Sequence, residues 1–161
     1  MKYFRLLVLA LLSVAIIGFN ACSKKNTITD PIDTTLYEVT FTLNGGGYTN
    51  QTFTFNSSGG AIYSSQYNVT NISFTGENNQ SLQIMMKGNS TGTYSFGSTD
   101  YSCSITTKDK PLFILTSGTL KITEFGSLLG NVKGTFSGSG VNTSAATITV
   151  TNGSFSCKRL S

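Results

Sequence analysis

The feature that most constrains the fold is an alternation of apolar and polar residues with a period of two. In residues 37–43, aromatic and aliphatic side chains alternate with Glu38, Thr40 and Thr42. Because successive side chains of a strand point to opposite faces, this pattern predicts a strand with one face in the core.

The same pattern recurs along the chain between breaks rich in Gly, Asn and Ser, among them residues 57–60, 117–118 and 138–140. It predicts further strands at residues 53–55, 67–75, 81–87, 92–96, 101–107, 112–116, 119–125, 131–137, 146–151 and 154–158. Asn152-Gly153, between the last two, is a strong signal for a hairpin turn. Only the short stretch 125–129 has any helical character. We therefore expect an all-β fold, an antiparallel β-sandwich or β-barrel of about ten short strands.

The first residues form a leader. Lys2 and Arg5 precede an apolar run at residues 6–17, which is shorter than the roughly 20 residues that span a bilayer. This pattern predicts a signal peptide. A cysteine then follows Ala21, and residues 18–22 resemble the lipobox of bacterial lipoproteins, where a peptidase cuts before the cysteine. The resemblance implies lipid attachment at Cys22; an ordinary secretory signal or a retained short anchor are the alternatives.

Three regions follow from this interpretation. Residues 1–21 are the lipoprotein signal peptide, residues 22–35 a polar, lipid-anchored flexible tether, and residues 36–161 a single all-β domain. Ser23 replaces the Asp that holds many lipoproteins at the inner membrane, which favours a lipid anchor in the outer membrane of a bacterial cell envelope. Whether the domain faces the periplasm or the cell surface stays open.

Composition argues against several function classes. The chain has 11 Lys and Arg residues against 7 Asp and Glu residues, and the cations are scattered rather than clustered, so nucleic acid is not an expected partner. It has no histidine, the usual general base and the commonest metal ligand. The glycine runs at 45–47 and 138–140 do not open helices, so they are not phosphate loops. We expect no enzyme activity, no metal and no cofactor.

Two cysteines lie in the expected domain. Cys103 is in phase with Tyr101 and Ile105, and Cys157 with Phe155, so both point toward the expected core. In an oxidising envelope they can form a disulfide. The alternative is two separate buried thiols that act as small apolar residues.

Ligand-binding residues are only weakly indicated. Tyr48 and Tyr63 stand beside glycine-rich breaks, where a tyrosine ring can stack on a sugar or a peptide. Aromatic residues are also common in strands for packing reasons alone.

The second half of the domain carries four motifs in a fixed order: T-G-T-Y at 91–94, G-T-L-K-I-T at 118–123, G-T-F at 134–136 and T-N-G-S-F at 151–155. This order resembles a family of small bacterial cell-envelope lipoproteins whose domain has no known function. The resemblance covers roughly residues 37–158 and implies an architecture, without catalytic residues.

The expected function is therefore that of a non-enzymatic binding or accessory module, held at the membrane by its lipid, with a glycan or an envelope protein as ligand. One alternative is a structural or adhesion subunit that pairs through an exposed strand edge. Another is a lipocalin-like carrier of a small apolar ligand.

Overall fold

The computed structural model describes residues 37–108 and 110–161, which belong to one compact unit. The predicted signal peptide, Cys22 and the tether lie outside the described residues and stay predictions. All ten elements are strands, so the all-β prediction is confirmed: β1 (Glu38–Gly45), β2 (Tyr48–Phe55), β3 (Ser58–Ser64), β4 (Val69–Thr75), β5 (Ser81–Lys87), β6 (Gly92–Phe96), β7 (Tyr101–Thr107), β8 (Lys110–Phe125), β9 (Asn131–Asn142) and β10 (Thr147–Lys158). This part of the chain contains no helix with the length and apolar character needed to cross a membrane.

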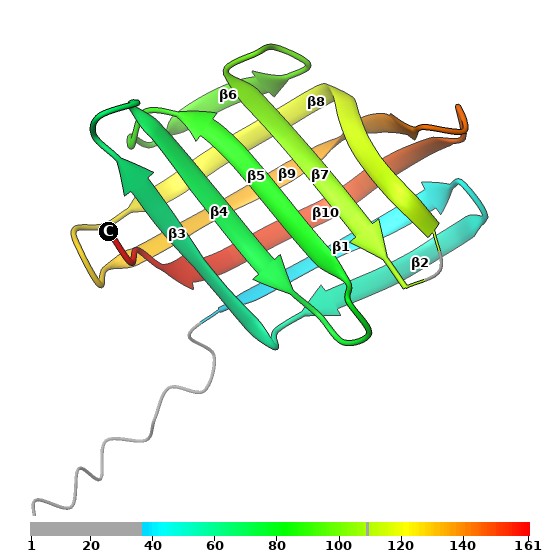
Figure 1. Cartoon of the computed structure of the whole chain (residues 1–161), viewed down its shortest axis with the longest axis horizontal. Coiled ribbons are helices and arrows are strands. Elements are labelled where there is room, and N and C mark those ends of the chain that lie inside the picture. The colour runs from blue at the N-terminus through cyan, green and yellow to red at the C-terminus, as the bar shows by residue number, and fades with distance from the viewer. Residues whose placement is uncertain (1–36, 109) are drawn as a thin grey trace, which may run out of the picture. The chain divides into compact units, whose positions relative to one another are not determined.

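The strands form one antiparallel sheet in the order β2-β1-β10-β9-β8-β7-β5-β4-β3, and β6 pairs with β8. The sheet curls back over itself, so that two layers of strands cross at an angle (Figure 1). We call β3, β4, β5 and β7 the front limb, and β6, β8, β9, β10, β1 and β2 the back limb. The architecture is a curled half-barrel, within the sandwich-or-barrel class that the alternation predicts.

Strand β8 connects the limbs. Its first half pairs with β7, where Ser104 lies opposite Ile114, and its second half pairs with β6, where Ser95 lies opposite Thr119. Its register against β9 shifts between Leu115 and Ser117. A register shift of this kind bends a strand, so β8 passes from the front limb to the back limb without interruption.

The last residues of the chain lie against the front edge of the sheet. Arg159 forms a parallel bridge with Ala61 of β3, the Leu160 N–H donates to the Ala61 carbonyl at 2.7 Å, and the Tyr63 N–H donates to the Ser161 carbonyl at 3.3 Å. These bonds occupy backbone groups of an edge strand that would otherwise be free to pair with another chain.

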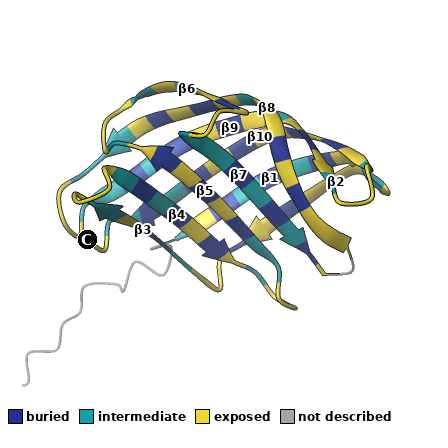
Figure 2. Cartoon of the chain, turned by 45° about the horizontal axis from the view of Figure 1, so that its top comes forward, coloured by how far each residue is buried: buried dark blue, intermediate teal, exposed yellow. Residues whose placement is uncertain are grey.

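The core fills the space between the limbs, and buried and exposed residues alternate along most of the strands (Figure 2). Phe41 contacts Phe53 in a stacked arrangement at 5.5 Å and Phe55 edge-on at 5.2 Å between ring centroids. Phe74 of the front limb packs against Phe155 of the back limb, with 6.1 Å between their ring centroids. Each buried ring contributes about 2–3 kcal/mol of hydrophobic stabilisation, so aromatic packing joins the limbs.

Four details of the predicted strand pattern are wrong. The break expected at residues 57–60 opens β3, which was not predicted. The breaks expected at residues 117–118 and 138–140 lie inside β8 and β9, and the predicted hairpin turn at Asn152-Gly153 lies inside β10. The chain therefore uses fewer and longer strands in its second half than the glycine pattern indicates.

Candidate functional site

The outer face of the back limb carries a regular array of hydroxyl groups. On β9, for example, Thr135 and Ser137 are exposed whereas Gly134 and Phe136 are buried. The strand register aligns such residues into rows, and one row runs through Thr54, Thr40, Ser154, Thr135, Lys121 and Thr93. Paired strands lie about 4.8 Å apart, so polar side chains on neighbouring strands of this row repeat at about that spacing.

A bulge in β10 interrupts this array. Between Val150 and Gly153 the register of β10 shifts against β9, and between Thr151 and Ser154 it shifts against β1. Strand β10 thus contains one extra residue relative to both neighbours. Asn152 adopts a left-handed backbone with φ of 53°, and both Thr151 and Asn152 are exposed on the outer face.

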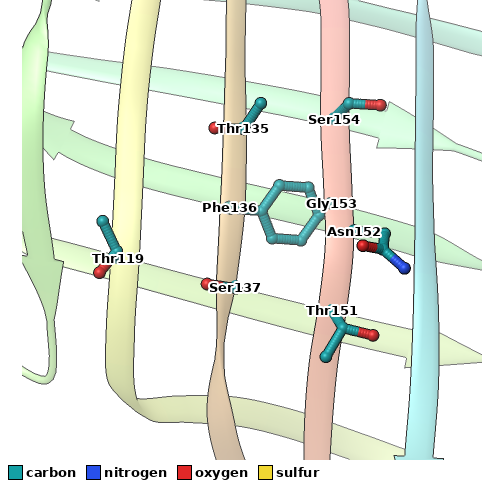
Figure 3. A pocket seen from close by; sticks show the side chains of 8 residues that line it. All are labelled: Thr119, Thr135, Phe136, Ser137, Thr151, Asn152, Gly153 and Ser154. Atoms are coloured by element: carbon teal, nitrogen blue, oxygen red, sulfur yellow. The ribbon is translucent and has the colours of Figure 1, made fainter.

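At this bulge the surface is hollowed over β8, β9 and β10 (Figure 3). The hollow has a volume of about 520 Å³ and is lined by Thr119, Thr135, Phe136, Ser137, Thr151, Asn152, Gly153 and Ser154. We call it the β8–β10 hollow. It is open to solvent along the sheet.

The core side of the bulge fixes the floor of the hollow. Phe136 is 3% exposed and packs against Phe41 at 6.0 Å and Phe155 at 6.4 Å between centroids. A Cβ atom on Gly153 would lie 2.7 Å from Cδ1 of the Phe136 ring. Glycine is therefore required at this position, and the ring holds the bulged strand in place from below.

The chemistry of the hollow is that of neutral hydrogen bonding. Its lining supplies hydroxyls of Thr and Ser and one carboxamide, each able to donate and to accept, and none of the lining residues titrates near neutral pH. Such a surface can bind a ligand rich in hydroxyl or amide groups. Within the lining there is no group that could serve as a general acid or base.

The two tyrosines proposed from the sequence lie elsewhere. The Tyr48 hydroxyl is hydrogen-bonded to Oγ1 of Thr107, and its ring packs edge-on against Phe53 at 5.4 Å. The Tyr63 hydroxyl donates to Oδ1 of Asn68 at 3.1 Å, and the Arg159 guanidinium lies 5.4 Å from the centre of its ring. Neither tyrosine lines the β8–β10 hollow, and their proposed role in ligand binding stays a prediction.

Cys103 and Cys157 are free, buried thiols. The structure has them as two separate thiols, and the disulfide that the sequence allows stays a prediction. Cys103 lies on β7 opposite Ile84, whereas Cys157 lies on β10 opposite Val132, and β8 and β9 separate the two strands in the sheet. Burial raises the pKa of both thiols, that of Cys157 to about 12.

The described carboxylates are surface groups. Asp100 pairs with Lys87 at 3.2 Å and Glu124 with Lys133 at 2.9 Å; the hydrogen bond from Lys133 is the main cause that lowers the pKa of Glu124. Among residues 37–108 and 110–161, no three Cys, Asp or Glu side chains come together as a metal site.

A smaller hollow of about 190 Å³ lies on the outer face of the front limb, lined by Val69, Asn71, Gln83, Met85, Ser102 and Ser104. There the Gln83 amide donates to Oδ1 of Asn71 at 3.1 Å. Because an internal bond already engages both amides, this surface is less available to a ligand than the β8–β10 hollow.

Sequence reasoning missed the β8–β10 hollow. Its threonines were interpreted only as strand residues, and Asn152-Gly153 only as a turn. The signal that could have found it is the continuation of the apolar–polar alternation on both sides of Asn152-Gly153, with the phase shifted by one residue.

Comparison of the chain with protein-family models, curated proteins and solved structures finds no match.

Proposed function

We propose that this chain is a lipid-anchored, non-enzymatic binding module of the bacterial cell envelope, and that it binds a glycan in the β8–β10 hollow. The observation that carries the choice of ligand is the lining itself, which offers neutral hydroxyl and carboxamide groups and no titratable side chain. A polyhydroxylated ligand matches such groups with donors and acceptors of its own.

The anchor rests on the sequence alone. The basic and apolar leader, the lipobox-like junction and the polar segment after Cys22 support it, as does the resemblance of residues 91–155 to small envelope lipoproteins. Two or three acyl chains on a cysteine bind a membrane stably, whereas one chain does so only marginally. The mass of mature Cys22 from cells would test the anchor directly.

The glycan proposal is tested with residues 22–161 carrying Cys22→Ala, applied to an array of bacterial envelope polysaccharides. Binding should be lost in Thr135→Val combined with Ser137→Ala, because these remove two hydroxyls that face the hollow. A matched control is Thr52→Val, on the same outer face at β2 and outside the hollow. Binding that survives the double substitution, or no binding to any polysaccharide, would reject the proposal.

One observation favours the alternative of a structural subunit. In the described part of the chain, β2 pairs with β1 on one side only, and residues 49–52 at its start are exposed. An open strand edge can accept a strand from another chain. This alternative predicts assemblies of purified protein on size-exclusion chromatography that Thr52→Pro disrupts, whereas the glycan module stays monomeric.

The carrier alternative finds less support. A lipocalin-like carrier needs a wide apolar cavity, but the space between the limbs is occupied by rings in contact, including Phe41, Phe136 and Phe155.

A further inference from the structure

One end of the domain exposes three leucines to solvent. Leu128 and Leu129, in the turn between β8 and β9, are 61% and 67% exposed, and Leu160, after β10, is 52% exposed. We call these residues the leucine patch. Backbone bonds hold the two segments together, since the Leu129 N–H donates to the Arg159 carbonyl at 2.8 Å and the Arg159 N–H donates to the Gly130 carbonyl at 2.9 Å.

The backbone conformation at Leu129 is unfavourable for a leucine, so the fold alone does not explain why leucine stands there. Leu129 has a φ of 63°, in the left-handed region. The other described non-glycine residues with positive φ are asparagines, apart from Ala145. A bulky apolar residue in this conformation is strained, and here its side chain also lies in water. Local structure would favour Asn or Gly, so a contact outside the domain is needed to account for leucine.

Cationic and aromatic groups surround the patch. The Arg159 guanidinium lies over the rings of Tyr63 and Phe125, at 5.4 and 5.5 Å from their centres. Lys158 donates to Oδ1 of Asn131 at 2.7 Å. Of the two acids at this end, Glu124 is already paired with Lys133, and Glu38 is exposed at the start of β1. Exposed leucines backed by Arg, Lys and Tyr are typical of surfaces that enter the interface of a membrane with anionic lipid.

The chain that leads back to Cys22 joins the domain at this same end. Glu38, the first residue of β1, lies opposite Ser156, three residues before Arg159. Tyr37 lies against Gly59 of β3, because a Cβ atom built on Gly59 would be 3.0 Å from Cβ of Tyr37. Leu160 lies against Gly60 in the same way, because a Cβ atom built on Gly60 would be 2.5 Å from Cδ1 of Leu160. Tyr37 and Leu160 thus flank adjacent residues of β3. Residues 22–36 can reach at most about 3.6 Å per residue, so a lipid at Cys22 keeps this end near the bilayer at a high effective concentration.

We propose that the leucine patch inserts into the interface of an anionic bilayer and seats the domain on the membrane. This inference rests on the proposed lipid anchor at Cys22. In this arrangement Leu128, Leu129 and Leu160 enter the boundary between headgroups and acyl chains, and the adjacent cations attract the anionic headgroups.

The test uses the absence of tryptophan from the chain. Residues 22–161 are coupled through the Cys22 thiol to maleimide lipid in phosphatidylcholine vesicles with or without phosphatidylglycerol; the buried Cys103 and Cys157 should not compete. Leu128→Trp should fluoresce at shorter wavelength on anionic vesicles, and brominated lipids should quench it. Leu112→Trp, at a 43% exposed leucine near the start of β8, is the matched control and should not change.

Adding Leu129→Asn and Leu160→Asn to Leu128→Trp should abolish the shift, and should weaken the binding of uncoupled protein to anionic vesicles roughly tenfold or more. An unchanged Leu128→Trp spectrum, or an equal shift in Leu112→Trp, would overturn the proposal. So would a shift that depends on protein concentration without vesicles, because a second copy would then cover the patch. Chemical coupling makes the outcome independent of whether cells acylate Cys22, which mass spectrometry tests separately.

Discussion

The ring of Phe136 occupies the space into which a side chain at Gly153 would project. A Cβ at Gly153 would also lie 2.4 Å from the Phe136 carbonyl oxygen, so rotation of the ring alone cannot make room. Gly153→Ala should therefore destabilise the domain by about 1–3 kcal/mol, measured by urea unfolding. Ser154→Ala, next along the strand and exposed, should change stability little. Equal stabilities of the two variants would contradict the packing described.

Tyr48 anchors the start of β2 to the end of β7. Its hydroxyl is hydrogen-bonded to Thr107, which is 3% exposed, so Tyr48→Phe leaves a buried hydroxyl without that partner. We expect a loss of about 1–2 kcal/mol in the free energy of unfolding. Tyr63→Phe removes an exposed bond to Asn68 and should cost distinctly less in the same assay.

The two buried thiols should be unreactive in the folded protein. Cys103 and Cys157 should resist a thiol reagent in buffer, and both should react after unfolding in guanidinium chloride without reductant. A chain purified from an oxidising compartment that yields no thiols on unfolding would show a disulfide instead.

The same thiols should make stability depend on alkaline pH. Burial raises the pKa of Cys157 from 9.0 to about 12 and raises that of Cys103 as well. The folded state therefore keeps its protons where the unfolded state loses them. The contribution of the protonated thiols to the free energy of unfolding is complete below pH 9. It falls as the pH rises toward 12, by at most about 1.4 kcal/mol per pH unit for each thiol. The stability advantage of the wild type over Cys157→Ala should shrink between pH 9 and 11; an advantage constant over this range would contradict the assignment.

Leu129 should be replaceable with a gain in stability. Its left-handed backbone costs a residue with a large side chain about 1 kcal/mol, whereas Asn tolerates it better. Leu129→Asn should raise the free energy of unfolding by up to that amount while it weakens membrane contact. Leu128→Asn, which lacks the positive φ, should leave stability nearly unchanged. A destabilised Leu129→Asn would show that the leucine is there for packing.

Local pattern predicts the strands along which the apolar–polar alternation is uninterrupted. Residues 81–87, 92–96 and 101–107 match β5, β6 and β7, because uninterrupted alternation determines each of them. It fails where glycine serves contacts between strands. The sequence pattern predicts a break between strands at Gly138. In the structure a Cβ atom there would lie 2.3 Å from the carbonyl of Ser117, so glycine permits the close approach of β9 to β8. The phase shift around Asn152-Gly153 marks the bulge in β10, but the β8–β10 hollow also depends on how β8 and β9 align with β10, which follows from the strand register.

Strand β1 pairs with β10 along most of its length, so the first strand of the domain cannot be completed until the last one has been made. Contacts this distant in sequence make folding slow. Until β9 and β10 arrive, Phe41 of the β1–β2 hairpin lacks the ring of Phe136 that packs against it. A chain exported from its N-terminus, as the leader predicts, would therefore cross the membrane before its first strand has paired with its last.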